Sequence, residues 1–403
     1  MTVVSIRASV PRPSIGELVS RAESIRPLVR SLAEQTESAR QVSAEAVAKM
    51  REAGLFRIMQ PAIYGGYEYG FDALVRVVAP LGAGCGSSGW VFSLGITHQW
   101  LAAVWPKQAQ DEYFADPDAI AAGSYAPVGK AVAVDGGYRL TGNWSFTSGC
   151  DHAQWLFLGG MIPPAKEGMP PKPAFFLLPR NDVGIDDNWF TMGLAGTGSK
   201  NTVANDVFVP THRVVLVADL FNGTAPGGAV HDNPLYRQSM MSALPFALVA
   251  PILGMVEGAL EDFIEMAKVR TTRGAVAGGN NRMAEFATIQ SRVAEATGSI
   301  DAARLTIFNA LDKAAAAAEA GEQANHDMRL RNRLSQAFSV RLLVQAVDAL
   351  FLASGGQGIF SSKPIQRAWR DAHAGAVHVS MNWDAVSTMY GQYALGLDPK
   401  GQY

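Results

Sequence analysis

The stretch from Gly142 to Trp155 combines aromatic and hydroxyl-bearing residues in a way that suits ligand binding. It begins as a strand pattern, in which Leu140, Trp144 and Phe146 alternate with polar residues. Small residues with hydroxyls follow, among them Ser148, before an apolar run resumes. Such a loop can lay a flat ligand against an aromatic ring and direct a hydroxyl at its polar edge. The same residues also fit a β-hairpin crossing with buried tryptophans.

Two histidines, His98 and His378, stand in otherwise apolar stretches for which the sequence predicts helices. If both side chains point into one pocket, they can bind a phenolate and shuttle its proton. A histidine in such a place can equally be a hydrogen-bonded core residue. The sequence alone does not show whether the two residues meet.

The segment Gly193–Lys200 contains three glycines and the hydroxyls of Thr197 and Ser199 before a predicted strand. It fits a tight β-turn, or a loop whose backbone and hydroxyls contact the edge or phosphate of a cofactor. Arg270 and Arg273 lie at the end of a long helix predicted from Ala243 to Arg270, where they can stay solvated or meet a phosphate.

Two glycine-rich runs have different interpretations. Residues 354–358 fit a plain helix break, or a backbone platform under a phosphate or ribityl chain. Residues 84–89 match the spacing of a dinucleotide-binding loop, but that motif needs a preceding strand, and the sequence predicts helices on both sides. No metal site is predicted, because the seven histidines form no His-x-x-x-His pair and no Cys-x-x-Cys accompanies them.

The composition predicts a soluble, cytoplasmic protein. Of 403 residues, 48% are hydrophobic and 17% charged, which is typical of a compact globular chain. The net charge of -2 favours neither nucleic acid nor an anionic membrane as a partner. Two cysteines fit a reducing compartment. The N-terminus lacks a signal-peptide pattern, and no apolar run reaches the roughly 20 residues that span a bilayer.

These candidate residues fall in three predicted domains of an α+β fold. Residues 1–118 show helical periodicity, including a capping box at Ser14 and Glu17. Residues 119–230 read as short strands separated by turn residues, which predicts a small antiparallel β-barrel or sandwich. Residues 231–403 return to long helices, the last predicted from Trp369 to about Leu395, and indicate a C-terminal bundle.

The order of these motifs resembles the acyl-CoA dehydrogenase superfamily over nearly the whole chain. The matching segments are residues 61–66, 144–155, 193–210, 270–290 and 354–358. The resemblance implies an N-terminal helical domain, a middle β-domain and a C-terminal four-helix bundle. It also implies a homotetramer, with flavin held between the β-domain and the bundle.

Dehydrogenases of this superfamily remove the substrate's α-proton with a glutamate. In many of them it lies about nine residues after the arginine of an Arg-Asp pair. Here that pair is Arg370 and Asp371, and the expected position is Val379. Other dehydrogenases place the glutamate earlier in the bundle, so Glu257 or Glu261 keeps an FAD-containing acyl-CoA dehydrogenase as the alternative function.

The pattern around His378 resembles the flavin-dependent monooxygenase branch, the oxygenase components of two-component hydroxylases that act on hydroxyphenylacetate, chlorophenols or a steroid-derived phenol. In that branch two histidines flank the aromatic substrate, and His98 and His378 match them. A serine near the substrate hydroxyl corresponds to Ser124, and the serine that bonds flavin N5 corresponds to Ser148, with Ser145 or Thr147 as substitutes. The other cofactor contacts implied are Trp144, Phe146, Thr197, Ser199, Arg270, Arg273, Gly355, Gly356 and Gln357.

This resemblance implies a flavin-dependent monooxygenase. The chain would receive reduced FMN or FAD from a separate flavin reductase, because it shows no nicotinamide site. With O2 as co-substrate it would form a C4a-hydroperoxyflavin and hydroxylate an aromatic, phenolic substrate. His98 would assist ionisation of the ring hydroxyl, and His378 would place or protonate the peroxide oxygen.

Overall fold

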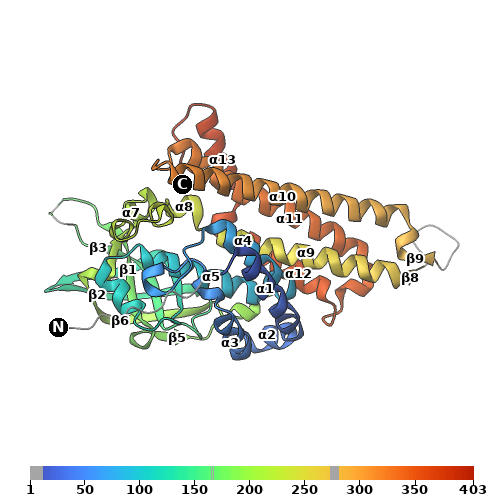
Figure 1. The fold of residues 1–403 in the computed structure, drawn as a ribbon, viewed down its shortest axis with the longest axis horizontal. Helices are drawn as coiled ribbons and strands as arrows, with labels where there is room; N and C mark the ends of the chain where they lie inside the picture. The colour runs from blue at the N-terminus through green and yellow to red at the C-terminus, as the bar shows by residue number, and fades with distance from the viewer. Residues whose placement is uncertain (1–11, 165, 167, 273–280) are drawn as a thin grey trace.

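The computed structural model describes residues 12–164, 166, 168–272 and 281–403. The sheet lies at one end of an elongated molecule and the long helices extend to the other end (Figure 1). The order of helices, then strands, then helices is as predicted from the sequence.

Six helices come first along the chain: α1 Ile15–Ser31, α2 Ala33–Ala39, α3 Ala44–Glu52, α4 Phe71–Gly84, α5 Gly86–Ala103 and α6 Lys107–Tyr113. The capping box predicted at Ser14 is present, since its hydroxyl accepts from the Glu17 backbone and the Glu17 carboxylate accepts in return. Only Cys85 separates α4 from α5, which confirms that helices flank the glycine-rich run on both sides.

Helix α5 lies between the sheet and the bundle, and every residue of it except Leu94 is buried. Apolar residues lie on all faces of α5, as expected for a helix that is packed on every side. Ser93 Oγ donates to the Ala247 carbonyl of the bundle at 2.5 Å. His98, further along α5, contacts the first strand of the sheet. Side chains on α5 therefore face both neighbouring layers.

The sheet has seven strands in the order β5-β6-β2-β1-β3-β4-β7. Their bounds are β1 Ala121–Val134, β2 Gly137–Thr147, β3 Trp155–Ile162, β4 Lys172–Pro179, β5 Gly184–Asp186, β6 Lys200–Pro210 and β7 Val214–Leu216. β1 pairs antiparallel with β2 but parallel with β3, so the prediction that all pairs are antiparallel is wrong for this pair. The reason is the connection: residues 148–154 carry the chain across the end of β1, and β3 joins its far side.

The C-terminal bundle is built from α9 Phe246–Val269, α10 Ala287–Glu319, α11 His326–Ser354 and α12 Pro364–Ala376, followed by α13 Trp383–Ala394. Shorter elements are α7 Val217–Asn222, α8 Met240–Ala243, and the hairpin of β8 Thr271–Thr272 with β9 Asn281–Arg282. The single last helix predicted from Trp369 to Leu395 is wrong, because α12 ends at Ala376 and a 3-10 turn at Val379–Met381 precedes α13. His378 therefore caps a turn instead of lying within a helix.

Two helical segments, Met240–Val269 and His326–Ile359, are long and apolar enough to cross a membrane by length and composition. The first is 89% buried against the rest of the chain over its most apolar window. Packing in the protein core thus accounts for its apolar character.

Candidate active site

A row of three hydroxyls joins the end of β2 to the loop before β6. Ser148 Oγ lies 2.6 Å from Ser199 Oγ, and Ser199 Oγ lies 2.6 Å from Thr197 Oγ1. The backbone N–H of Gly149 donates to the Thr197 carbonyl at 2.9 Å, which fixes the two loops together. All three hydroxyl-bearing residues are buried or nearly so, at 8%, 3% and 2% exposed for Ser148, Ser199 and Thr197.

An exposed aromatic ring lies two residues before this row. Phe146 has a positive φ of 66° and is 68% exposed, with its ring edge-on to that of Trp189. Trp144 differs: it is 0% exposed, and its indole N–H donates to the Gly159 carbonyl inside the sheet. The structure thus makes Phe146 available to a ligand and gives Trp144 a position in the core, where it has no surface for a cofactor.

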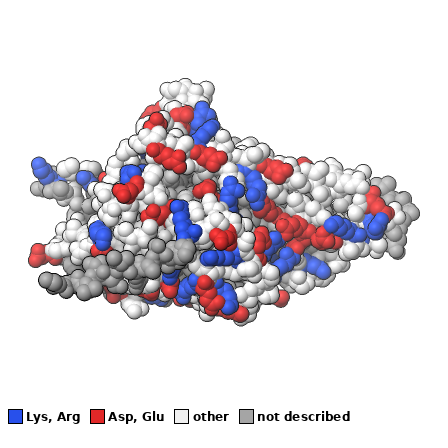
Figure 2. Space-filling model, viewed as in Figure 1, with Lys and Arg blue, Asp and Glu red and all other residues white. Residues whose placement is uncertain are grey.

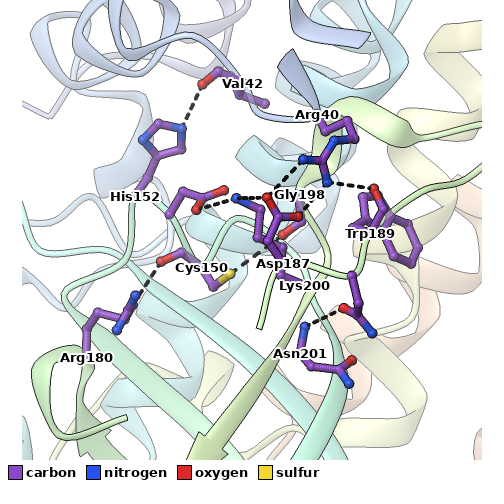
Figure 3. A network of polar contacts seen from close by, with 12 residues as sticks. Arg40, Val42, Cys150, His152, Arg180, Asp187, Trp189, Gly198, Lys200 and Asn201 are labelled. Carbon is purple, nitrogen blue, oxygen red and sulfur yellow. Dashed lines mark hydrogen bonds and ion pairs between the residues drawn. The ribbon is translucent and has the colours of Figure 1, made fainter. Parts of the chain in front are cut away.

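Ion pairs hold the loop that follows Ser148 (Figure 3). Lys200 Nζ lies 2.9 Å from the Asp151 carboxylate and 3.6 Å from that of Asp187. Arg40, from the end of α2, pairs with the same Asp187. His152 is also engaged, since its Nε2 contacts a backbone carbonyl near α3 at 2.8 Å. The network connects the N-terminal helices to both loops that carry the hydroxyl row.

The loop before β6 is anchored to α12 by a buried carboxylate. Asp371 Oδ1 accepts the backbone N–H of Leu194 at 2.6 Å, and Leu194 has a positive φ of 52°. A Cβ on Gly193 would lie 2.2 Å from the Arg370 carbonyl, so only glycine allows this approach. Burial raises the pKa of Asp371 to about 6, against the lowering effect of the Leu194 N–H.

His98 is fully hydrogen-bonded on the sheet side of α5. Its Nδ1 lies 2.5 Å from the Ala121 carbonyl, and its Nε2 lies 2.7 Å from the Tyr125 hydroxyl. A carbonyl can only accept, so Nδ1 carries the proton and Nε2 accepts from Tyr125. Burial lowers the pKa of His98 to about 4, which keeps the imidazole neutral at neutral pH.

Ser124 and Tyr125 are neighbours on β1, and the sequence reasoning identified only the first. Ser124 Oγ donates to the Ser145 carbonyl of β2 at 2.7 Å. Tyr125 stacks on Phe175 with ring centroids 4.9 Å apart, and its hydroxyl reaches His98. The sequence offered one indication of Tyr125, its position next to Ser124 on the predicted strand. Successive side chains of a strand point to opposite faces of the sheet, so choosing Ser124 directed attention to the other face.

One ring nitrogen of His378 is hydrogen-bonded to the backbone and the other is not. Its Nδ1 accepts the backbone N–H of Ser380 at 3.1 Å, which makes Nε2 the protonated nitrogen of the neutral ring. Among the described residues, no hydrogen-bond acceptor meets Nε2–H. Burial, and then the charge of Arg333, lower the pKa of His378 to about 4. Arg333 is itself 3% exposed and donates to the Ser380 carbonyl at 3.0 Å.

The two histidines do not touch each other, and their contacts lie at different points along α5. His378 packs against Trp90 with ring centroids 6.2 Å apart. Trp90 precedes His98 by eight residues, which is about 12 Å along a helix. The structure therefore associates His378 with the Trp90 end of α5 and His98 with the part of α5 that contacts β1, and no contact within the described part of the chain joins the two rings.

A second group of predicted residues comes together at the end of the bundle. Arg270 Nη1 donates to the Ser354 carbonyl at 2.8 Å, directly before Gly355, Gly356 and Gln357, which are all exposed. This end of α9 and α11 is the one near β8 and β9, away from the sheet (Figure 1). No hydrogen bond between described residues joins this group to the hydroxyl row. Arg273 lies outside the described residues.

The carboxylates considered for a dehydrogenase base are engaged elsewhere. Glu257 pairs with Arg304 at 2.5 Å, and Glu261 pairs with Arg26. These residues line a cleft between α1, α4, α9 and α10, and Figure 2 shows basic and acidic residues mixed along this face. Val379, at the position expected for the other glutamate, is 77% exposed and apolar. Within residues 12–164, 166, 168–272 and 281–403, no cluster of His, Cys, Asp or Glu suits a metal ion.

Family models match both helical domains of the chain. Residues 21–114 match the family model of the acyl-CoA dehydrogenase N-terminal domain, and residues 246–383 match that of the C-terminal domain. The chain is 47% identical to the oxygenase component of FADH(2)-dependent resorcinol hydroxylase from Rhizobium sp., over 96% of each protein. It is 38% identical to the flavin-dependent monooxygenase oxygenase subunit HsaA of Rhodococcus jostii, over 94% of this chain and 98% of that one.

A solved structure is similar over the same length. The 3-HSA hydroxylase from Rhodococcus sp. RHA1 superposes with a TM-score of 0.90 at 37% identity, covering 96% of this chain and 98% of that one. A second, XiaF from Streptomyces sp. in complex with FADH2 and glycerol, gives a TM-score of 0.87 at 30% identity, covering 96% and 97%.

Proposed function

Because the chain belongs to the oxygenase components of flavin-dependent monooxygenases that share the acyl-CoA dehydrogenase fold, we propose that it hydroxylates a phenolic substrate with reduced flavin and O2. The observation that carries this proposal is the neutral His378 next to Val379. The position where a dehydrogenase of this fold needs a carboxylate is held by the apolar Val379, and the residue before it offers an Nε2–H donor.

The residues around Ser148 fit a flavin. Phe146 offers an exposed ring for one face of a flat heterocycle, and the hydroxyl row begins two residues further along the chain, at Ser148. The Ser148 side chain is the member of the row nearest to this ring along the chain. Reduced flavin supplies the two electrons and activates the oxygen that is transferred.

His378 holds the reacting oxygen in place in this proposal. Its neutral ring is a hydrogen-bond donor through Nε2, and burial prevents it from becoming an imidazolium acid at neutral pH. It therefore orients an oxygen atom without donating its proton outright. Trp90, which packs against the His378 ring and is itself 5% exposed, would shield one side of that oxygen from water.

His98 and Tyr125 form the route for the substrate's hydroxyl proton. Tyr125 donates to His98 Nε2, so the Tyr125 oxygen keeps its lone pairs for the hydroxyl of a substrate. When the Tyr125 oxygen takes up the substrate's proton, Tyr125 gives its own hydroxyl proton to Nε2, and the Nδ1–H bond to Ala121 stabilises the protonated ring. Since burial holds the pKa of His98 near 4, the proton moves only as the aromatic carbon forms its bond to oxygen.

Because Arg270 and residues 355–357 lie at the end of the bundle away from the sheet, they would contribute in this proposal to the phosphate end of a flavin whose ring is held by another copy of the chain. We take the cofactor to be FAD, after the FADH(2)-dependent relative from Rhizobium. Large apolar side chains surround these glycines, with Leu352 77%, Ile359 69% and Phe360 54% exposed. Exposed apolar surface of this kind supports assembly with further copies, and we propose a homotetramer.

The partners follow from the same scheme. A separate flavin reductase supplies the reduced flavin, as the term oxygenase component in the relatives' names indicates. Cytoplasmic localisation is supported by Cys85 and Cys150, which are both buried and unpaired. The substrate is a phenol, and resorcinol is the first one to test.

The test supplies photoreduced FAD and O2 to the purified chain with resorcinol, and measures hydroxylated product per O2 consumed. Product in proportion to O2, with little hydrogen peroxide, is the expected result. Reduction of bound oxidised FAD by an acyl-CoA, with no hydroxylated product from any phenol, would instead establish the dehydrogenase.

A further inference from the structure

We propose that Thr197 and Ser199 are positioning residues, which turn the Ser148 hydroxyl into an obligate hydrogen-bond acceptor on its outer side. The inference rests on the proposed function, since it concerns the flavin atom that Ser148 meets. It assigns the two residues a role other than direct contact with the cofactor.

The direction of each hydrogen bond follows from counting protons. Thr197 Oγ1 lies 2.8 Å from the Leu194 carbonyl, and only the Thr197 proton can fill that gap, because a carbonyl has none. Two acceptor oxygens at this distance without a proton between them would repel each other. The single proton of Thr197 is therefore committed to Leu194.

The remaining two bonds then have only one possible direction. The contact between Thr197 and Ser199 needs a proton, and Ser199 must supply it. The contact between Ser199 and Ser148 needs another, and Ser148 must supply that one. The Ser148 hydroxyl hydrogen is thus turned inward, and only oxygen lone pairs face outward.

Burial prevents water from replacing the partners that fix the direction of these hydrogen bonds. Thr197 and Ser199 are 2% and 3% exposed, so no solvent donor or acceptor competes for them. Leu194 also accepts from the Trp189 indole N–H at 3.1 Å and from the Thr197 backbone N–H. Loss of the Thr197 hydroxyl alone would therefore leave the Leu194 carbonyl satisfied and the loop folded.

An obligate acceptor distinguishes the two redox forms of a flavin at N5. Reduced flavin carries a proton on N5 and would donate it in a hydrogen bond to the Ser148 oxygen. Oxidised flavin has a lone pair on N5, which would face the lone pairs of Ser148 and be repelled. The row then favours the reduced form on arrival and releases the oxidised form after turnover. A chain that takes its flavin from a separate reductase needs that asymmetry.

The experiment measures dissociation constants for oxidised and for photoreduced flavin, anaerobically for the latter, in wild type, Thr197→Val and Ser199→Ala. Either substitution lets the Ser148 proton turn outward. The ratio of oxidised to reduced dissociation constant should fall about three- to tenfold, the usual weight of one hydrogen bond. A tenfold fall corresponds to a midpoint potential of the bound flavin about 30 mV lower.

Two control variants isolate the effect. Thr202→Val removes a buried hydroxyl that bonds Thr147 at 3.0 Å outside the row, and it should leave the ratio unchanged. Thr197→Ser keeps the hydroxyl and should retain the wild-type ratio.

The outcomes are separable. A fall in the ratio of oxidised to reduced dissociation constant in Thr197→Val and Ser199→Ala, but not in the control variants, supports the inference. An unchanged ratio in both variants, or an equal change in Thr202→Val, overturns it and leaves the proposed function standing. Failure of the wild-type chain to bind either form of flavin overturns both.

Discussion

Replacing His378 by asparagine separates its two hydrogen-bonding roles. The Asn Oδ1 can take the place of Nδ1 and accept the Ser380 N–H, so the cap of the turn at Val379–Met381 survives. The donor at Nε2 is lost. Removal of one aligned donor from a developing charge costs about 2.7–4 kcal/mol, so product formation should slow by about 10²–10³-fold.

The complementary variant is His378→Gln, whose amide nitrogen reaches the place of Nε2 while the cap is lost. It should keep most of the product formation and lose about 1 kcal/mol of stability. The assay supplies photoreduced flavin and measures hydroxylated product and hydrogen peroxide per O2. In His378→Asn, O2 consumption should continue with peroxide in place of product. Product within twofold of wild type in His378→Asn, or equal losses in both variants, would refute the assigned role.

Three further outcomes are expected. The pKa of His98 is about 4 in the folded chain, against 6.5 for an ordinary histidine, so the unfolded chain binds the proton first as pH falls and the folded state loses stability between these two values. His98→Gln should therefore reduce the fall in unfolding free energy between pH 7 and pH 5 by about 2 kcal/mol, as measured by urea unfolding. Tyr125→Phe should lower the hydroxylation rate by about 10²-fold with substrate affinity within threefold, and a rate close to wild type would exclude Tyr125 from the proton route. Asp371→Ala should cost about 1–3 kcal/mol by leaving Leu194 N–H unpaired, whereas Asp371→Asn, which keeps the acceptor and removes a buried charge, should be neutral or stabilising in thermal unfolding.

Local patterns in the sequence were sufficient to predict much of the fold. The capping box at Ser14 and the helices around Cys85 depend on residues close in the chain, and both are present. The parallel pairing of β1 with β3 was not predictable in this way, because the route of the 148–154 loop across the sheet depends on tertiary packing. The break at Val377 was missed because apolar periodicity continues through it.

In the candidate site, too, residue types were predictable from the sequence whereas contacts between distant segments were not. Residue types drew attention to Ser148, Thr197 and Ser199, but their mutual contacts depend on two loops that meet only in the folded chain. The pairing of His98 with Tyr125 joins α5 to β1 and leaves no trace in the spacing of the sequence. Hydrogen-bond direction, which decides what Ser148 and His378 can do, follows from partners that only the three-dimensional arrangement supplies.

The most direct test of the proposed activity follows the oxygen atom. Purified chain, chemically reduced FAD and a phenol are mixed under ¹⁸O2 without any reductase, and the product is analysed by mass spectrometry. The account predicts one ¹⁸O atom in the ring hydroxyl that is added. Product oxygen derived from water, or hydrogen peroxide as the sole product with every phenol and with either FAD or FMN, would contradict it.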